Sequence, residues 1–327
     1  MDRRAFVLAA LAGVASPRAA LAQGAKKVWR VGYLSMASPE ADRQWVAALR
    51  EGLRELGYVE GQNTVLELRH ASSQAAKMPG LAADLVRRDV AVIVAYGSAA
   101  IDATKKAAAT MPIVMTVHAD PVGTGTVASM ARPGGTITGL TDGHADLAPK
   151  RLELIKEVVP SASRVAALLN PATPHAVRQL EHLQSAGPRM GVTILPIEIN
   201  GANDIERAFA VMAKQRSDAL VLIPDPTWWV GQQRRVANLA LKYRLPAIGT
   251  VREFADQGIL LAYGTNFAEL WHRSATYVDK ILKGANPGDL PIEHPTRFHL
   301  VINLKTAKTL GITVPRSVLL RADQVLE

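Results

Sequence analysis

Apolar and polar residues alternate along this chain in a way that predicts strands and helices in turn. A short apolar run at residues 28–34 predicts a strand, and an amphipathic segment at 39–56 predicts the helix that follows it. One face of that helix carries the apolar residues Trp45, Leu49, Leu53 and Leu56, which recur at spacings of four, four and three. Ser38 before Pro39 predicts the beginning of the helix, and Gly57 predicts its end.

The same alternation continues to the end of the chain. Further strands are expected at residues 64–68, 90–95, 113–117, 164–169, 192–196, 219–223, 247–250, 259–263 and 298–302. Further helices are expected at residues 81–88, 99–109, 147–158, 175–190, 205–215, 234–243, 267–282 and 305–310. Strands and helices that alternate through short loops predict mainly parallel sheets covered on both faces. Because the pattern restarts near residue 147, we expect one α/β architecture used twice.

The first residues predict an export signal rather than part of the fold. Arg3 and Arg4 precede an apolar run at residues 5–15, and Ala20-Leu21-Ala22 forms a cleavage motif. We therefore expect cleavage near Ala22 and a mature protein in the periplasm. The paired arginines are compatible with both the general secretory route and the twin-arginine route. The chain has no cysteine, so we expect neither disulfides nor a lipid anchor on a cysteine.

The basic charge of the chain does not predict a nucleic-acid partner. Removal of residues 1–22 takes away three arginines and one aspartate, which lowers the net charge from +9 to +7. The remaining lysines and arginines are scattered among acidic residues, as in Arg50-Glu51 and Arg54-Glu55, with no basic tract interleaved with aromatic residues. We interpret this charge as a solvated surface.

Common enzyme and metal motifs are absent from the sequence. There is no G-x-S-x-G, no G-x-x-x-x-G-K-[ST], no G-x-G-x-x-G after the first strand and no H-E-x-x-H. His175 and His182 lie seven residues apart on one helix face, which is too little for a metal site. We therefore expect no catalytic residues, no metal, no cofactor and no enzymatic activity.

Stretches spread over residues 28–327 resemble a known family. They lie at residues 52–63, 112–114, 120–123, 131–140, 150–160, 277–284, 300–315 and 321–323, and include ARPGGTITGL and LVINLKTAKTLGITVP. The chain resembles the substrate-binding proteins of ABC transporters whose better-known relatives take up tryptophan and related amino acids. The sequence departs from the usual family pattern at Thr136, at residues 257–262 and at Trp271-His272-Arg273.

The resemblance implies a type I periplasmic-binding fold, in which two Rossmann-like lobes with parallel sheets are joined by a three-segment hinge. The crossings are expected near residues 141–144, 264–267 and 295–298. Lobe one then comprises residues 28–143 and 266–296, and lobe two comprises 144–265 and the tail 297–327. The implied function is capture of a small polar ligand, an amino acid or other carboxylate, by hinge closure, with delivery to a membrane permease and its ATPase. A sensing domain for a membrane signalling partner and a periplasmic enzyme remain as alternatives.

Ligand groups in such folds lie after the carboxyl ends of strands. The candidates there are Ser35, Ser38, Gly97, Ser98, Ala99, Asp120, Asp142, Asn170, Asp225, Trp228 and Tyr263. Each of the small polar residues also suits a helix cap or a turn.

These candidates fall into three expected roles. The turn at Gly97-Ser98-Ala99, at the beginning of a helix, is expected to bind a carboxylate or similar group, helped by Ser35 and Ser38. One of the three aspartates is expected to pair with an ammonium group, and Asp225 is preferred because it closely follows an apolar strand. Trp228 and Tyr263 are the candidates for stacking on the ligand. Packing is an equal alternative for Trp228, whereas a hinge role is favoured for Tyr263 and a turn for Asn170.

Overall fold

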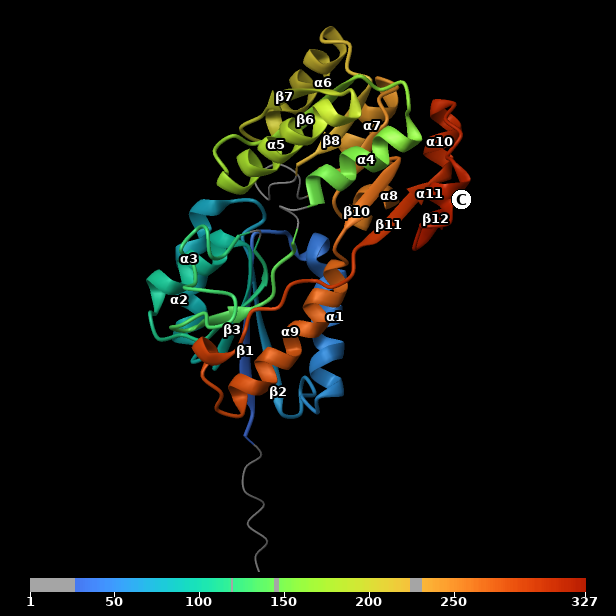
Figure 1. Cartoon of the computed structure of the whole chain (residues 1–327). Coiled ribbons are helices and arrows are strands. Elements are labelled where there is room, and N and C mark those ends of the chain that lie inside the picture. The colour runs from blue at the N-terminus through green and yellow to red at the C-terminus, as the bar shows by residue number, and fades with distance from the viewer. Residues whose placement is uncertain (1–26, 119, 144–146, 224–230) are drawn as a thin grey trace, which may run out of the picture.

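Two α/β bodies, each built around one sheet, make up the computed structural model, which describes residues 27–118, 120–143, 147–223 and 231–327 (Figure 1). The first sheet is entirely parallel and has the strand order β2-β1-β3-β4-β5. Its strands are β1 (Trp29–Ser35), β2 (Thr64–His70), β3 (Val92–Tyr96), β4 (Ile113–Val117) and β5 (Ile137–Gly139). The expected parallel α/β architecture is confirmed in this body.

The second sheet has the strand order β12-β11-β10-β9-β8-β6-β7. Its strands are β6 (Arg164–Leu169), β7 (Thr193–Glu198), β8 (Ala219–Leu222), β9 (Ala247–Gly249), β10 (Leu261–Gly264), β11 (His299–Asn303) and β12 (Gln324–Leu326). All pairs are parallel except β10 with β11. The antiparallel pair arises where the chain returns to this sheet after visiting the first body.

Helices cover both sheets. The first body has α1 (Pro39–Glu55), α2 (Met78–Arg87), α3 (Ser98–Ala107) and the late α9 (Phe267–Leu282). The second has α4 (Ala148–Val158), α5 (Pro174–Ala186), α6 (Ile205–Lys214), α7 (Gln233–Lys242), α8 (Arg252–Asp256), α10 (Leu304–Leu310) and α11 (Arg316–Leu319). Every strand and helix expected from the pattern is present within a few residues. The pattern missed β5, β12, α8 and α11, which have at most five residues each.

The beginning of α1 follows the predicted local chemistry. The Ser38 Oγ accepts a hydrogen bond from the Ala41 N–H at 3.3 Å, and Pro39 occupies the first turn, where no N–H partner is needed. Gly57 has a φ of +87°, the left-handed region that glycine adopts without strain. The helix therefore begins and ends where the sequence predicts.

Helices α1 and α9 pack closely although more than 200 residues separate them in the sequence (Figure 1). Gly52 allows the approach, because a Cβ at this position would lie 2.4 Å from the carbonyl oxygen of His272. The aromatic cluster of Trp45, Tyr96, Phe267 and Trp271 fills the space between these helices and the end of β3, with ring centroids 5.0 to 6.4 Å apart. This packing fixes α9, which follows β10 of the second sheet, onto the first body.

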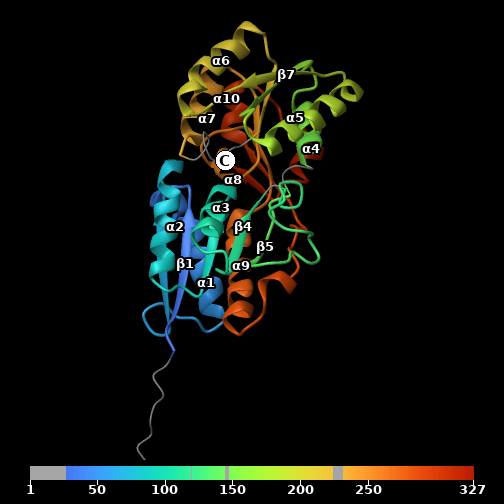
Figure 2. The ribbon, with the colours of Figure 1, turned by 90° about the vertical axis from the view of Figure 1, so that its left-hand side faces the viewer.

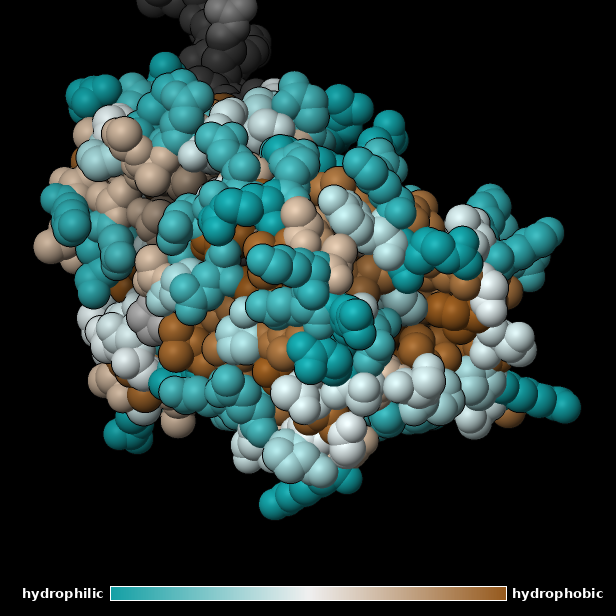
Figure 3. Space-filling view, turned by 90° about the horizontal axis from the view of Figure 1, so that it is seen from above, coloured by the Kyte–Doolittle hydropathy of each residue, from teal (hydrophilic) through white to brown (hydrophobic). Residues whose placement is uncertain are grey.

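The strands of the first sheet run toward the second body, so their carboxyl ends face it (Figures 1 and 2). Seen from above, hydrophilic and hydrophobic residues are interspersed over the visible face of the molecule (Figure 3). None of the helices within the described ranges is long and apolar enough to cross a membrane.

Candidate functional site

The carboxyl ends of β1 and β3 bring two of the predicted segments together. Ser35 pairs with Tyr96 in the sheet register, and the loops that follow these residues therefore begin side by side. Ser35 is fully buried, and its Oγ accepts a hydrogen bond from the Ala37 N–H at 3.0 Å. Ser38 is engaged as the cap of α1. Both serines thus shape the loop that borders the turn at Gly97-Ser98.

The turn at Gly97 has the geometry of an acceptor-binding site. Gly97 has a φ of +82° and supplies no side-chain cap to α3, which begins at Ser98. Within the described part of the chain, no group accepts from the N–H of Ser98 or Ala99. Both residues are exposed. Free N–H donors at the positive end of a helix dipole favour an anionic or acceptor group at this point.

His118, directly after β4, lies beneath this turn. It is 3% exposed, and its Nε2 is 3.4 Å from the Ser98 Oγ and 3.2 Å from the Thr126 Oγ1. Its Nδ1 accepts the Asp120 N–H at 3.2 Å. Burial is the main reason that the pKa of His118 is below its usual range, and neighbouring His175 lowers it further, whereas the carboxylates around it act in the opposite direction. Those carboxylates are Asp142, Asp120 and Asp102. The imidazole is thus held neutral.

Asp120 and Asp142 lie on the same side of the first body as His118. The Asp120 Oδ1 accepts the Gly123 N–H at 2.8 Å, and its Oδ2 is 2.5 Å from the Nη1 of Arg178 on α5 of the second body. Asp142 is 6% exposed, and its carbonyl accepts from the Thr265 Oγ1 at 2.6 Å. Asp120 is therefore already paired. Asp142 is a buried residue beside two segments that connect the bodies.

The candidates on the second body have mixed surroundings. Asn170 is 5% exposed, and its Oδ1 accepts the Ala172 N–H at 3.0 Å, as in a turn after β6. The Tyr263 carbonyl accepts from Arg151 Nε at 2.9 Å, and the Tyr263 ring lies 6.2 Å from the Phe298 ring. Asp225 and Trp228 lie outside the described residues.

Arg151 is fully buried in α4, which lowers its pKa to about 9. Its Nη1 donates to the Gln179 Oε1 at 3.2 Å, and nearby Asp142 partly offsets the effect of burial. This arginine therefore holds the end of β10 against α4 and α5, next to the segment that leads to α9.

A second contact joins the two bodies at Glu253. This residue lies in α8, after β9, and its Oε1 accepts from Gln44 Nε2 at 2.5 Å and from Trp45 Nε1 at 3.2 Å. Both donors lie on α1 of the first body. Burial raises the pKa of the Glu253 carboxyl. Trp45 also packs edge-on against Tyr96, at 5.4 Å between ring centroids, so this contact reaches the turn at Gly97.

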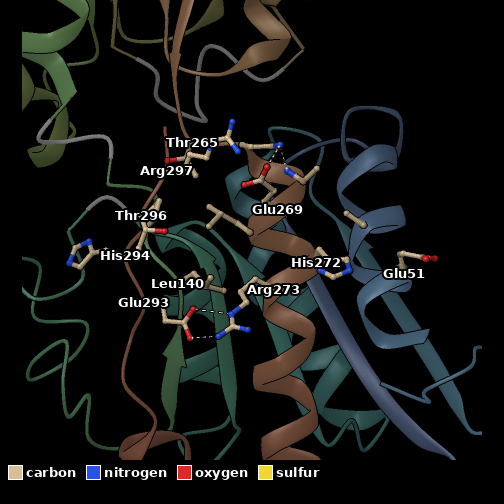
Figure 4. Close-up of a pocket in the computed structure, with 15 residues that line it drawn as sticks. Glu51, Leu140, Thr265, Glu269, His272, Arg273, Glu293, His294, Thr296 and Arg297 are labelled. Atoms are coloured by element: carbon tan, nitrogen blue, oxygen red, sulfur yellow. Dashed lines mark hydrogen bonds and ion pairs between the residues drawn. The ribbon is translucent and has the colours of Figure 1, made fainter. Parts of the chain in front are cut away.

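A groove of about 640 Å³ lies between α1, α9 and the segment 293–297 (Figure 4). Arg273 donates to both carboxylate oxygens of Glu293 at 3.0 and 2.9 Å, and His272 Nε2 is 3.1 Å from the Glu55 carboxylate. None of the sequence-predicted candidates lines this groove. Arg273 and Glu293 are paired within the groove, whereas His272 and Arg297 pair with Glu55 and Asp323, which do not line it. The groove lies along α9 and is separate from the candidate residues.

Comparison with known proteins identifies the family. Residues 31–326 match the family model described as ABC transporter substrate binding protein. The chain belongs to this family. The match covers nearly all of the described residues, so it includes both bodies and the connections between them.

Three similar proteins illustrate the relationship. A tyrosine-binding protein of Clostridioides difficile (strain R20291) is 23% identical over 262 residues, which span 80% of this chain and 75% of the relative. An ABC domain from Streptococcus pneumonia, solved in complex with L-Trp, is 25% identical with a TM-score of 0.84, over 92% of this chain and 100% of that chain. A conserved domain protein from Vibrio cholerae O1 biovar eltor is 27% identical with a TM-score of 0.84, over 91% of this chain and 100% of that one.

These matches confirm two of the sequence-based expectations. The resemblance to ABC-transporter substrate-binding proteins is confirmed, and so is the fold of two mostly parallel sheets with flanking helices. The chain is therefore a substrate-binding protein of the ABC transporter type.

Sequence reasoning missed four residues of interest at the carboxyl edges of the sheets. They are His118, Thr126, Thr250 and Glu253. His118 lies two residues before the candidate Asp120, but its contact with Ser98 depends on strand order. Thr250 follows β9 and is fully buried, and no described residue bonds its Oγ1. Glu253 lies in α8, which the pattern missed, and its partners lie about 210 positions earlier.

Proposed function

We propose that this protein captures a small carboxylate ligand, an aromatic amino acid above all, between its two bodies and presents it to a membrane permease. Family membership and the L-Trp complex of a relative support this ligand class. The observation that carries the proposal is the turn at Gly97, where the N–H groups of Ser98 and Ala99 have no acceptor among the described residues. A carboxylate satisfies both donors and gains from the helix dipole.

The other candidate residues complete the proposed site. Ser35 and Ser38 hold the loop beside the turn, and Asp142 or Asp225 pairs with the ligand's ammonium group. Asp120 is a weaker partner for that group, because Arg178 and the Gly123 N–H already occupy its carboxylate.

Three further candidates belong to the second body in this proposal. Trp228 and Tyr263 border the ligand's ring, and Asn170 shapes the loop after β6.

Capture proceeds in this proposal by closure of two lobes about three crossing segments. Lobe one comprises residues 28–143 and 266–296, and lobe two comprises 144–265 and 297–327. The sheet membership of β10, β11 and β12 supports this division, as does the packing of α9 on α1. The Thr265–Asp142 hydrogen bond ties two of the crossings together. A clam-shell motion of this kind excludes water from the polar contacts of the ligand.

The juxtaposition of Ser98, His118 and Asp120 raises the question of a hydrolase, and the hydrogen bonds argue against one. In a catalytic triad the histidine donates Nδ1–H to a carboxylate and accepts the serine proton on Nε2. Here Nδ1 accepts a backbone N–H instead, so the neutral imidazole carries its proton on Nε2. His118 is then unable to act as the base for Ser98, and we propose that the ligand leaves unchanged.

We place the mature protein in the periplasm, after removal of residues 1–22. The signal-like pattern of those residues and the family's role in transport support this location. The partners in this proposal are a permease and an ATPase of an ABC transporter.

The carboxylate site is tested with a double variant, Ser98→Ala with Ala99→Val, in the mature protein after it has been unfolded and refolded to remove bound ligand. Isothermal titration with L-tryptophan and L-tyrosine measures Kd. We expect a rise of about tenfold or more, because a hydrogen bond to a charged group is worth roughly 1.5–3 kcal/mol. Ser317→Ala, in the exposed first turn of α11, is the matched control and leaves Kd unchanged. An unchanged Kd in the double variant refutes the carboxylate site.

A further inference from the structure

The loop after β4 contains a ring of hydrogen bonds whose direction is fixed by chemistry. The Asp120 N–H is only a donor, so the His118 Nδ1 that faces it at 3.2 Å is the acceptor. The Asp120 carbonyl is only an acceptor, so the Thr124 hydroxyl donates to it at 2.8 Å. Thr124 has then used its proton, and Thr126 is the donor in the 3.0 Å contact between the two hydroxyls. Thr126 in turn accepts from the His118 Nε2–H at 3.2 Å.

Every donor in this ring therefore points the same way, from Asp120 N–H to His118, then to Thr126, Thr124 and back to the Asp120 carbonyl. Such a closed chain strengthens each of its bonds. It requires the neutral Nε2–H form of His118, because an Nδ1 proton would face the Asp120 N–H. The burial of the His118 side chain (3% exposed) and its lowered pKa agree with the neutral form.

The ring has a direct consequence for Ser98. Its Oγ lies 3.4 Å from the His118 Nε2, which already carries a proton, and no described residue bonds the Ser98 Oγ apart from His118. The Ser98 proton is thus directed away from His118 and toward the space at the beginning of α3. Three donors then face that space, namely the Ser98 O–H and the N–H groups of Ser98 and Ala99.

We propose that His118 is a positioning residue that fixes Ser98 as a hydrogen-bond donor, so that this turn selects a carboxylate over a carboxamide. The proposal rests on the proposed function, since it assigns the polarity of the same site. A carboxylate offers only acceptors to the three donors, whereas a carboxamide offers one acceptor and an NH₂ group that finds no partner there. An unmatched polar group in an enclosed site is costly, so this polarity determines specificity.

The tautomer is measured first, because it needs no ligand. Long-range ¹H–¹⁵N correlation of ¹⁵N-histidine-labelled mature protein distinguishes the two neutral tautomers, and the His118→Gln variant assigns the signal. We expect Nε2 protonated and Nδ1 unprotonated at pH 7.5. Protonation on Nδ1 overturns the inference and leaves the proposed ligand class intact.

The selectivity is measured with L-tryptophan and L-tryptophanamide as a matched pair. In the unaltered protein we expect the carboxylate to bind at least about tenfold more tightly than the amide, as the loss of one charge-assisted bond predicts. The His118→Leu variant removes the Nε2–H group that directs the Ser98 proton, so its Kd for L-tryptophan rises and the carboxylate-to-amide ratio falls toward one. If the role of His118 were purely structural, the variant would bind both compounds more weakly by the same factor, and the ratio of their affinities would not change.

Thr126→Val is the matched control, because it breaks the ring but leaves the Asp120 N–H on Nδ1. It is expected to retain the preference for the carboxylate, and thermal unfolding verifies that each variant is folded. Equal affinity of the unaltered protein for both compounds contradicts this inference alone. Failure of both to bind contradicts the proposed ligand class, while the tautomer measurement still decides the direction of the ring.

Discussion

Trp45→Phe is the substitution that tests most sharply how the two bodies are held together. It removes the indole N–H that donates to Glu253 at 3.2 Å and keeps an aromatic ring in the cluster with Tyr96 and Trp271. Trp271→Phe is a matched control. Its N–H donates at 3.0 Å to the Tyr33 hydroxyl, a partner within the first body. The two variants thus lose the same chemical group, one between the bodies and one inside a single body.

The expected magnitude follows from the kind of bond lost. A hydrogen bond to a charged acceptor contributes roughly 1.5–3 kcal/mol, and Gln44 still binds Glu253, so the lower end applies. About 1.5 kcal/mol is close to a tenfold shift between closed and open arrangements. Because apparent affinity scales with the closed fraction, Kd is expected to rise by up to about tenfold in Trp45→Phe. Trp271→Phe lowers thermal stability with little change in Kd.

Small-angle X-ray scattering and isothermal titration with L-tryptophan provide the two measurements. The ligand-free Trp45→Phe protein is expected to have a larger radius of gyration than the unaltered protein, and Trp271→Phe is not. Identical scattering and identical affinity in the two variants would show that the Glu253 contact does not favour closure, and the reasoning would be wrong.

Three further predictions concern packing, titration and the exposed ion pair. Gly52→Ala is expected to lower the free energy of unfolding by about 1–3 kcal/mol, because its Cβ would clash with the His272 carbonyl. Gly80→Ala, in open space on α2, is the control and is expected to lower that free energy by less than about 1 kcal/mol or to raise it, as chemical denaturation measures. Since the pKa of His118 is lowered in the folded state, the free energy of unfolding should fall as pH drops below about 6.5. Denaturation across pH 5–8 should show a weaker pH dependence for His118→Gln, and the same pH dependence in both proteins would contradict a neutral, buried His118. The Arg178 side chain, which pairs with Asp120, is 49% exposed, so Arg178→Ala is expected to weaken L-tryptophan binding by less than about fivefold at low salt and by less at 0.5 M salt. A larger loss of affinity in these titrations would mean that solvent does not screen the ion pair.

Local chemistry explains why the elements of the fold could be predicted. Strand and helix periodicity, the Ser38 cap and the positive φ of Gly57 each depend on neighbours within a few residues. The short strands β5 and β12 were not predicted, because three residues are too few to show a period. Strand order is also not readable from periodicity alone, since it depends on packing between distant segments.

The candidate site likewise has parts that depend on local sequence and parts that depend on distant packing. The position of the turn at Gly97 and Ser98 was predictable, because an apolar strand there leads directly into a helix pattern. The contact of His118 with Ser98 requires β3 and β4 to be neighbours, and the contact of Glu253 with Trp45 joins residues 208 positions apart. Neither contact leaves a local pattern in the sequence. The strand order of the first sheet was needed to assign a role to His118, and the arrangement of the two bodies was needed for Glu253.

The most direct test of the central claim is a ligand screen on the mature protein after it has been unfolded and refolded. Thermal unfolding is followed with L-tryptophan, L-tyrosine, other amino acids and organic acids, and mass spectrometry examines the released compound. A ligand at one hundred times its Kd adds about 2.7 kcal/mol, which raises the unfolding midpoint by several degrees. We predict such a shift for an aromatic amino acid that is recovered intact. No shift with any carboxylate, or recovery of a chemically altered compound, would contradict the account.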